Sequence, residues 1–301
     1  MRDQFFRERV FIAAILLAAL TFGCYTQAPK PAVEVRTRSF TDDLGRKVEV
    51  PEKVDRLISL APNLTEIVFA VGGGDKLVGV TTFCNYPIQA QAIRKVSDTQ
   101  TPNIETIVAL QPQVVFVSTS SQLEAFTKVL TEQQIAVFVS APNRLDDIYK
   151  SITTVGEILG TADHAEDVVR KMRSRVANVR DSTSGRDRPK VFVQIDKNSL
   201  YTIGKDSFIT DIIARAGGIS ATADLATAYP NLSRETALAM NPDVIVISES
   251  EGNREPNEVF RNSPAVKSGR VFLVNADLLS RPGPRIVDAL EQIADKLRPR
   301  K

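Results

Sequence analysis

The chain of 301 residues has no tryptophan, one histidine and two cysteines. A single histidine, His164, leaves no redundant set for a Ser-His-Asp centre and no multi-histidine site for a bare zinc or manganese ion. The glycines of "GGGDKLVG" (72–79) lack the G-K-[ST] ending of a phosphate-binding loop, and Leu77 occupies the last glycine position of the dinucleotide pattern. We therefore expect no catalytic residues, no resident metal and no cofactor, which favours a binding protein over an enzyme.

An excess of charge of one sign is also missing. Lysine and arginine number 38 against 36 aspartates and glutamates, a net charge of +2. This balance gives no support for a nucleic-acid partner. The hydrophobic content of 43% is ordinary for a globular protein, and the length allows two domains, each with its own core.

The N-terminal residues 1–24 predict an export signal. Basic residues precede the apolar run "VFIAAILLAALTFG" (10–23), which is short for a membrane span, although an uncleaved anchor is the alternative. The run ends at Cys24, in a context that resembles a lipoprotein processing site, where the cysteine carries the lipid. Residues 25–38 then form a tether without periodicity. The other cysteine, Cys84, is expected to be an unpaired, inert small apolar residue.

One unit of the chain occurs twice. "NIETIVALQPQVVFVS" (103–118) and "NLSRETALAMNPDVIVIS" (231–248) each contain a short helix, a proline and a strand, and Glu105 and Glu235 are 235 − 105 = 130 residues apart, as are the two prolines. A second pair, in the same order, consists of "TEIVFAVGG" (65–73) and "TDIIARAGG" (210–218). Two repeated units in one order predict two lobes with the same plan.

The periodicity predicts an α/β fold. Strands alternate with helices in both halves, which is typical of parallel α/β layers. Strand signals are absent across residues 144–189, where apolar positions three and four apart predict one long helix at about 161–183. We expect an N-terminal α/β lobe at 39–143, a helical connection that contains this bridging helix, and a similar C-terminal lobe at 190–298.

Three segments in joint order resemble a known family. They are "RLISLAPNLTEIVFAVGGGDKLVGVTTFCNYP" (56–87), the unit around Glu105, and "RPGPRI" (281–286). Together they are similar to the periplasmic binding proteins of ABC importers for cobalamin and iron–siderophore complexes, and most of all to the cobalamin-binding branch. The resemblance extends from about residue 40 to residue 297. It implies two similar α/β lobes with central sheets, bridged by one rigid helix, with the ligand in a cleft between the lobes.

The resemblance also assigns a role to the repeated glutamates. In this family a glutamate on each lobe docks against arginines of the permease dimer, and the matching residues are Glu105 and Glu235. Asn103 and Ser233 are plausible N-caps that place each glutamate in the first helical turn. Acidic residues there also suit the helix dipole, which is the simpler interpretation. Two glutamates at equivalent places match a two-fold partner, so we favour docking.

The family's ligand contacts carry over to five positions: Tyr86, Tyr201, Tyr229, Asp277 and Arg281. Aromatic faces stack on flat ligands, and an aspartate and an arginine can bond amides or hydroxyls at the rim. Each tyrosine taken singly could instead be a half-buried residue at a strand end. Receptors of the cobalamin branch carry tryptophan in the cleft, whereas this chain has Thr99, Ser118 and Tyr229 at those places, so the ligand stays open between corrinoids, siderophores and haem.

The sequence therefore predicts the substrate-binding component of an ABC importer that captures a corrinoid-like metal chelate. Such a protein is exported to the periplasm or held outside the cytoplasm by a lipid on Cys24, and we expect it to be a monomer. A ferric-siderophore or haem receptor is the alternative within the family. A chelatase-like two-lobed enzyme, which would need a metal-facing His/Glu set, and a lipoprotein sensor are alternatives from other classes.

Overall fold

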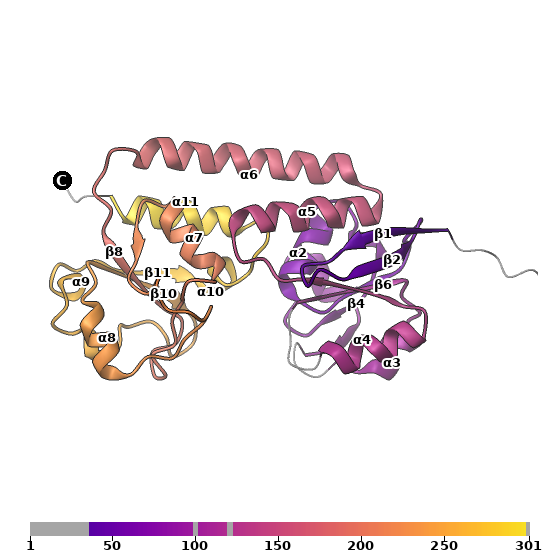
Figure 1. Cartoon of the computed structure of the whole chain (residues 1–301), viewed down its shortest axis with the longest axis horizontal. Coiled ribbons are helices and arrows are strands. Elements are labelled where there is room, and N and C mark those ends of the chain that lie inside the picture. Colours follow the sequence, from indigo (N-terminus) through magenta and orange to yellow (C-terminus); the bar gives the residue numbers. More distant parts are fainter. Residues whose placement is uncertain (1–35, 99–101, 119–122, 299–301) are drawn as a thin grey trace, which may run out of the picture. The chain divides into compact units, whose positions relative to one another are not determined.

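The computed structural model describes residues 36–98, 102–118 and 123–298 (Figure 1). The predicted export signal, the lipidation site at Cys24, most of the tether and Thr99 lie outside these ranges. Within the described residues, no helix combines the length and the apolarity that a membrane crossing needs.

The N-terminal half contains a parallel sheet with helices around it. Its five strands lie in the order β5-β4-β3-β6-β7, preceded in the chain by an antiparallel hairpin of β1 and β2. The strands are β1 (Thr37–Thr41), β2 (Lys47–Pro51), β3 (Leu57–Ser59), β4 (Leu77–Thr81), β5 (Lys95–Ser97), β6 (Val114–Ser118) and β7 (Ala136–Ser140). The helices are α2 (Pro62–Ala70), α3 (Ile104–Ala109), α4 (Leu123–Glu132) and α5 (Leu145–Leu159), with 3₁₀ turns at Gly74–Lys76 and Ile88–Ala92. The central strands are apolar runs because helices cover both faces of a parallel sheet.

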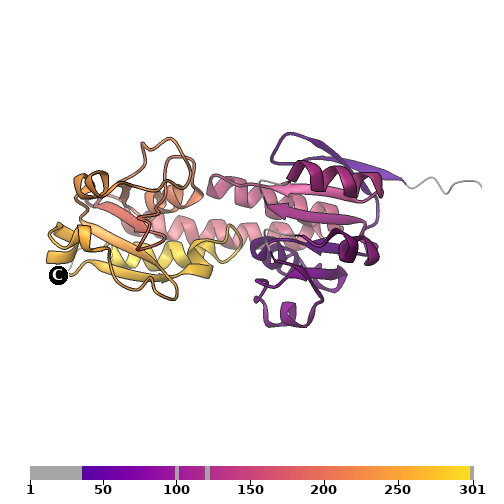
Figure 2. The same cartoon turned by 90° about the horizontal axis from the view of Figure 1, so that it is seen from below.

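The C-terminal half contains a second parallel sheet, in the order β11-β10-β8-β9 (Figure 2). Its strands are β8 (Lys190–Gln194), β9 (Ile219–Ser220), β10 (Val244–Glu249) and β11 (Val271–Asn275). Its helices are α7 (Phe208–Arg215), α8 (Arg234–Met240), α9 (Pro264–Lys267), α10 (Ala276–Leu279) and α11 (Ile286–Lys296), with a 3₁₀ turn at Glu258–Phe260. The two sheets are separate, so the prediction of two α/β lobes is confirmed.

The internal repeat is confirmed by the topology. In each sheet the first strand, β3 or β8, lies between the second strand, β4 or β9, and the third, β6 or β10. The helices α2 and α7 join the equivalent strands and end in the same way. Gly72 and Gly217 have positive φ values of 81° and 87°. The amides of Gly73 and Gly218 then donate back to the helix carbonyls at 2.8 and 3.0 Å.

The predicted bridging helix is α6 (Ala162–Thr183), which packs along α5 and α11 (Figure 1). Its buried stripe contains Ala165, Met172 and Val179. An unbroken helix has no soft dihedral that could absorb a large closure, so we expect only a small hinge motion. One cluster of buried apolar side chains continues from Val48 through α5 and α6 to Leu297. The exact domain boundaries therefore stay a prediction, because the core continues past both ends of the helical connection at 144–189.

A network of ion pairs fastens α6 to α11, and its strength is expected to depend on pH. Arg175 contacts Asp288 and Glu291 at 2.6 Å each. The bond from Arg175 holds the pKa of Glu291 below its ordinary value of 4.5. A carboxyl whose pKa is lowered by folding stabilises the fold above its ordinary pKa, and this stabilisation is lost as the pH falls through the lowered value.

We therefore expect Arg175→Met to reduce the free energy of unfolding at pH 7 by about 1 kcal/mol or less, because the groups are partly exposed. The variant should also lose less stability than the wild type as the pH falls below 4.5, because the bond from Arg175 to Glu291 is already absent. Urea unfolding at neutral and acid pH measures both effects. Arg261→Met, at an exposed arginine without a described ion pair, is the control; the same acid dependence in both variants would contradict the prediction.

Candidate functional site

Two of the predicted tyrosines form a pair in the C-terminal half. The ring centroids of Tyr201 and Tyr229 lie 6.2 Å apart, and the ring planes are inclined by 30°. The main chain of Tyr201 bridges to Asp196 after β8 and to Asn231 before α8, so these loops are joined at the tyrosines. Tyr229 is 38% exposed, yet burial of its phenol raises its pKa above the ordinary value. The pair thus offers a neutral aromatic surface with polar tips.

The third tyrosine, Tyr86, lies in the loop after β4. The thiol of Cys84 is buried between the hydroxyls of Thr65 and Thr81, at 3.1 and 3.2 Å, and is free as predicted. This buried contact anchors the loop on the N-terminal sheet. Tyr86 is 46% exposed, and the guanidinium of Arg285 lies 3.8 Å from its ring centroid. Tyr86 therefore contacts the segment that precedes α11.

A polar network, which we call the Glu66 cluster, joins α2 to the "RPGPRI" segment. Glu66, with a side chain only 2% exposed, accepts bonds from Arg281 at 2.9 Å and from Arg285 at 2.8 and 2.5 Å. Arg281 also bonds Asn85 and Asp277, each at 2.7 Å, and Asn85 donates to Asp277 at 3.0 Å. In this cluster two guanidinium groups bond two carboxylates and one amide. The residues come from both halves of the chain.

The structure thus brings three predicted ligand residues together and keeps two apart from them. Tyr86, Asp277 and Arg281 lie in or beside the Glu66 cluster. Among the described residues, no hydrogen bond, ion pair or ring contact joins them to Tyr201 and Tyr229. Their roles as ligand contacts stay predictions. A cavity of about 380 Å³ opens beside the cluster. Residues that line it include Glu66, Phe69, Tyr86, Pro87, Pro284 and Arg285.

Sequence reasoning missed Glu66 and Arg285. A signal for Glu66 was present, because it is a charge within the otherwise apolar run "TEIVFAV" (65–71), and a buried carboxylate needs a cationic partner. Arg285 is the second arginine of "RPGPRI". Exposed apolar side chains near Tyr86 were also not predicted: Phe83 is 55% and Ile88 is 68% exposed. Both extend the apolar surface of the Tyr86 loop.

The repeated glutamates have matching local structure. The side chain of Asn103 accepts from the amide of Thr106 at 2.9 Å, and that of Ser233 accepts from the amide of Thr236 at 3.1 Å. Both residues are N-caps, as predicted, and place Glu105 and Glu235 in the first turns of α3 and α8.

Both glutamates are exposed, and neither forms an ion pair with a described residue. Hydrogen bonds from the helix start, its own backbone amide first and Ser233 second, hold the pKa of Glu235 below its ordinary value. In Figure 1, α3 and α8 lie on the side away from α6. Each lobe therefore presents an accessible carboxylate at an equivalent place.

The charges of the Glu66 cluster are balanced by pairing within the cluster. Both arginines near Tyr86 already face carboxylates, so little positive charge is left for an anionic ligand. No group of three or more His, Cys, Asp or Glu side chains within the described ranges is arranged to hold a metal ion. The exposed side chains of the Tyr86 loop include the aromatic and apolar Phe83, Tyr86 and Ile88, together with the polar Asn85 and Gln89.

Comparisons with known proteins agree with the two-lobed α/β fold. Residues 57–278 match the periplasmic binding protein family. The chain is 30% identical to YvrC of Bacillus subtilis (strain 168), an uncharacterized ABC transporter substrate-binding lipoprotein, over 97% of this chain and 98% of the relative.

Two solved structures extend the comparison to named ligands. The periplasmic vitamin B12 binding protein BtuF of Vibrio cholerae is 30% identical, with a TM-score of 0.73 over 82% of this chain and 98% of that one. The periplasmic haem-binding protein RhuT of Roseiflexus sp. RS-1 is 25% identical, with a TM-score of 0.71 over 81% of this chain and 97% of that one.

Proposed function

Because the chain belongs to the periplasmic binding protein family, as the exported substrate-binding component of an ABC transporter, we propose that it captures a corrinoid-like metal chelate. The ligand lies against Tyr86 on one side and against Tyr201 and Tyr229 on the other, with Asp277 and Arg281 at the rim. The protein then delivers the chelate to the permease and performs no chemistry on it. The family consists of transport components, and the vitamin B12 binding relative supports this substrate class.

One observation carries the choice of ligand: Tyr86 is 46% exposed beside two arginines that are already paired with Glu66. Tyrosine rings offer flat apolar faces with a polar tip, which suit a macrocycle with amide arms. An anionic ferric siderophore would be expected to need arginines that are free to bond it. Arg281 and Arg285 bond Glu66, so a ligand with little negative charge is favoured.

Haem is the second candidate, and Tyr86 is the residue that favours it. A tyrosine oxygen can ligate haem iron, and Tyr86 is half exposed beside a cavity. The haem-binding relative shares the fold. Haem carries two propionates, however, and their charge would compete with Glu66 for the arginines. We therefore rank a corrinoid first.

For delivery, we propose that Glu105 and Glu235 dock against arginines of the permease dimer. Supporting observations are the equal N-caps, the exposure of both carboxylates and the lack of a described ion pair at either one. A helix dipole alone would explain an acidic first turn on each helix, but it does not require a pair on duplicated lobes.

Calorimetry with cyanocobalamin, cobinamide, haemin and a ferric siderophore tests the ligand. We expect cyanocobalamin or cobinamide to bind most tightly. Tyr201→Ala and Tyr229→Ala should each weaken binding by about tenfold, because an aromatic anchor typically contributes 1 kcal/mol or more. Leu44→Ala, which removes an exposed large apolar side chain in the hairpin between β1 and β2, is the control. If neither corrinoid binds while haemin or the siderophore does, the corrinoid proposal is wrong and the transport class remains.

A further inference from the structure

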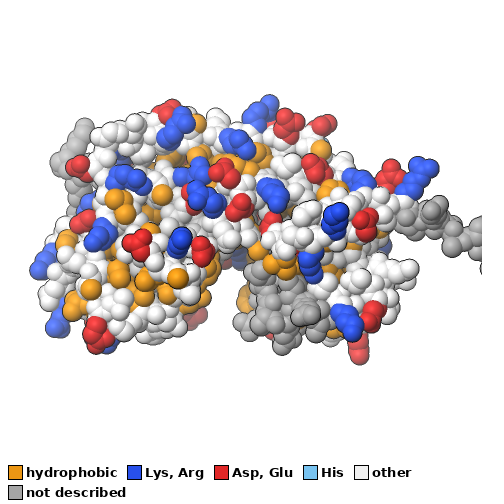
Figure 3. All heavy atoms as spheres, in the orientation of Figure 1, with side chains coloured by type: hydrophobic (Ala, Val, Ile, Leu, Met, Phe, Trp, Pro, Cys, Tyr) orange, Lys and Arg blue, Asp and Glu red, His pale blue; other side chains and the backbone are white. Residues whose placement is uncertain are grey.

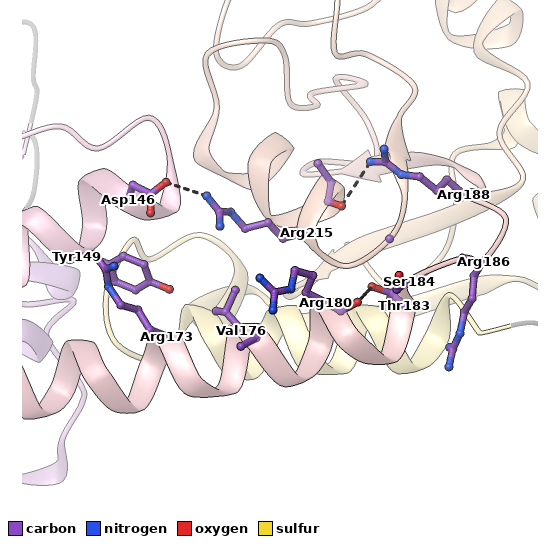
Figure 4. Close-up of a pocket in the computed structure, with 14 residues that line it drawn as sticks. Asp146, Tyr149, Arg173, Val176, Arg180, Thr183, Ser184, Arg186, Arg188 and Arg215 are labelled. Carbon is purple, nitrogen blue, oxygen red and sulfur yellow. Dashed lines mark hydrogen bonds and ion pairs between the residues drawn. The ribbon is translucent and has the colours of Figure 1, made fainter.

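A second pocket, which has no lining residue in common with the Glu66 cluster, lies where α5, α6 and α7 meet the connection to β8 (Figure 4). Its volume is about 490 Å³, within the range of small-molecule sites. None of the predicted ligand or docking residues lines it. Figure 3 shows basic side chains gathered over α6 and α7, with acidic side chains among them.

The lining of this pocket is strongly basic. It contains the arginines Arg173, Arg180, Arg186, Arg188 and Arg215, and one carboxylate, Asp146. In Figure 4 the guanidinium of Arg186 points away from the others, and those of Arg180 and Arg215 point toward the space beside Tyr149.

Internal partners neutralise only part of this charge. Arg215 contacts Asp146 and Asp211 at 2.9 Å each, and Arg180 contacts the exposed Asp181 at 3.0 Å. Arg173 and Arg188 form no ion pair with a described residue. Arg173 lies 4.9 Å from the ring centroid of Tyr149. Arg188 donates to the carbonyl of Gly218 at 2.8 Å. A guanidinium has five N–H donors, so each keeps donors for a ligand.

The hydroxyl of Tyr149 is the second, independent sign of a ligand. The residue is only 4% exposed, and its oxygen is buried without a hydrogen-bond partner among the described residues. A buried hydroxyl without a partner destabilises a fold by about 1–3 kcal/mol. In Figure 4 this hydroxyl points from α5 toward Val176 and Arg180, into the pocket. A group that enters the pocket and accepts hydrogen bonds would satisfy it.

We propose that this pocket binds a ligand that carries a phosphate group. Phosphate oxygens accept the paired N–H groups of arginine and the phenolic O–H, and the negative charge of a phosphate monoester or diester suits a basic site. The pocket is larger than one phosphate, which leaves room for an attached organic group. The phosphate can belong to a soluble phosphate ester or to the headgroup of an anionic phospholipid. The proposal does not depend on which chelate binds at Tyr86, Tyr201 and Tyr229.

The test compares glycerol 3-phosphate with vesicles of phosphatidylglycerol or phosphatidylcholine, by calorimetry and cosedimentation at low salt. We expect saturable binding of the phosphate ester and a loss of at least tenfold in Arg173→Gln and Arg180→Gln. Arg170→Gln, at an exposed arginine of α6 that does not line the pocket, is the control and should show no loss. Binding only to phosphatidylglycerol vesicles, with the same pattern among the variants, supports the headgroup as the source. No binding of either probe, or equal losses in Arg180→Gln and Arg170→Gln, overturns the proposal.

The Tm of Tyr149→Phe, measured with and without glycerol 3-phosphate, tests the role of the hydroxyl. Without the probe, the Tm of the variant should equal or exceed that of the wild type, because the hydroxyl has no partner to lose. With glycerol 3-phosphate, the rise in Tm should be smaller than that of the wild type. A lower Tm of the free variant would show that the hydroxyl already has a partner inside the protein, and would overturn its assignment as a ligand donor.

Discussion

Reversing the charge of Glu105 or Glu235 is expected to reduce transport by at least tenfold and to leave ligand affinity unchanged. Both carboxylates are exposed, and neither has a described contact with the predicted ligand residues, so we expect Glu105→Arg and Glu235→Arg to leave the ligand contacts unchanged. If each glutamate faces an arginine of the permease, reversal places like charges together, which costs several kcal/mol at an interface. Uptake of the ligand into vesicles that contain the reconstituted permease measures the effect, and calorimetry measures the affinity.

Two controls separate docking from a local effect on the helix. Glu132→Arg changes an exposed glutamate at the end of α4, away from a first turn, and should transport normally. Glu105→Gln removes the charge without adding a clash, so it should fall between wild type and Glu105→Arg. Normal transport by both reversal variants would mean that these glutamates only stabilise helix starts, a contribution of about 0.3–1 kcal/mol.

The features that sequence reasoning predicted well are local or repeated. The helix α6 was predicted within one residue at its start, because its apolar stripe at three- and four-residue spacing is long. The N-caps at Asn103 and Ser233 depend on a side chain and an amide three residues later. The equal topology of the two sheets follows from the repeated units, since similar units tend to bury the same faces.

The features that were missed depend on contacts between distant parts of the chain. Glu66 and Arg285 are 219 residues apart, and nothing in the local sequence of either residue shows that they meet. The same is true of Arg281, which was predicted as a rim residue but whose side chain is bonded by Glu66, Asn85 and Asp277. The continuous core through α5 and α6 was also not predicted, because periodicity shows which face of a helix is buried but not against which partner.

The Glu66 cluster is where a single substitution is expected to destabilise the protein most. Glu66→Gln leaves Arg281 and Arg285, whose side chains are 11% and 21% exposed, without the carboxylate that both contact. Removing one partner of a buried ion pair costs about 3–5 kcal/mol, and the lower end applies here because Asp277 still pairs with Arg281. We expect the free energy of unfolding to fall by about 3 kcal/mol, and the Tm by at least about 5 °C. Urea and thermal unfolding measure these changes, with Glu157→Gln, at an exposed glutamate of α5, as the neutral control.

The same variant tests the proposal that the protein prefers a ligand with little negative charge. Neutralising Glu66 leaves the two guanidinium groups near Tyr86 with an excess of positive charge. Affinity for haemin, which is anionic, should then rise relative to cyanocobalamin, by about tenfold if one guanidinium turns to the ligand. The ratio of the two affinities is measured at a temperature where the variant is folded. A stable Glu66→Gln protein would show that the cluster is exposed to solvent in solution. An unchanged ratio of affinities in a destabilised protein would show that Glu66 joins the two halves of the chain without selecting the ligand.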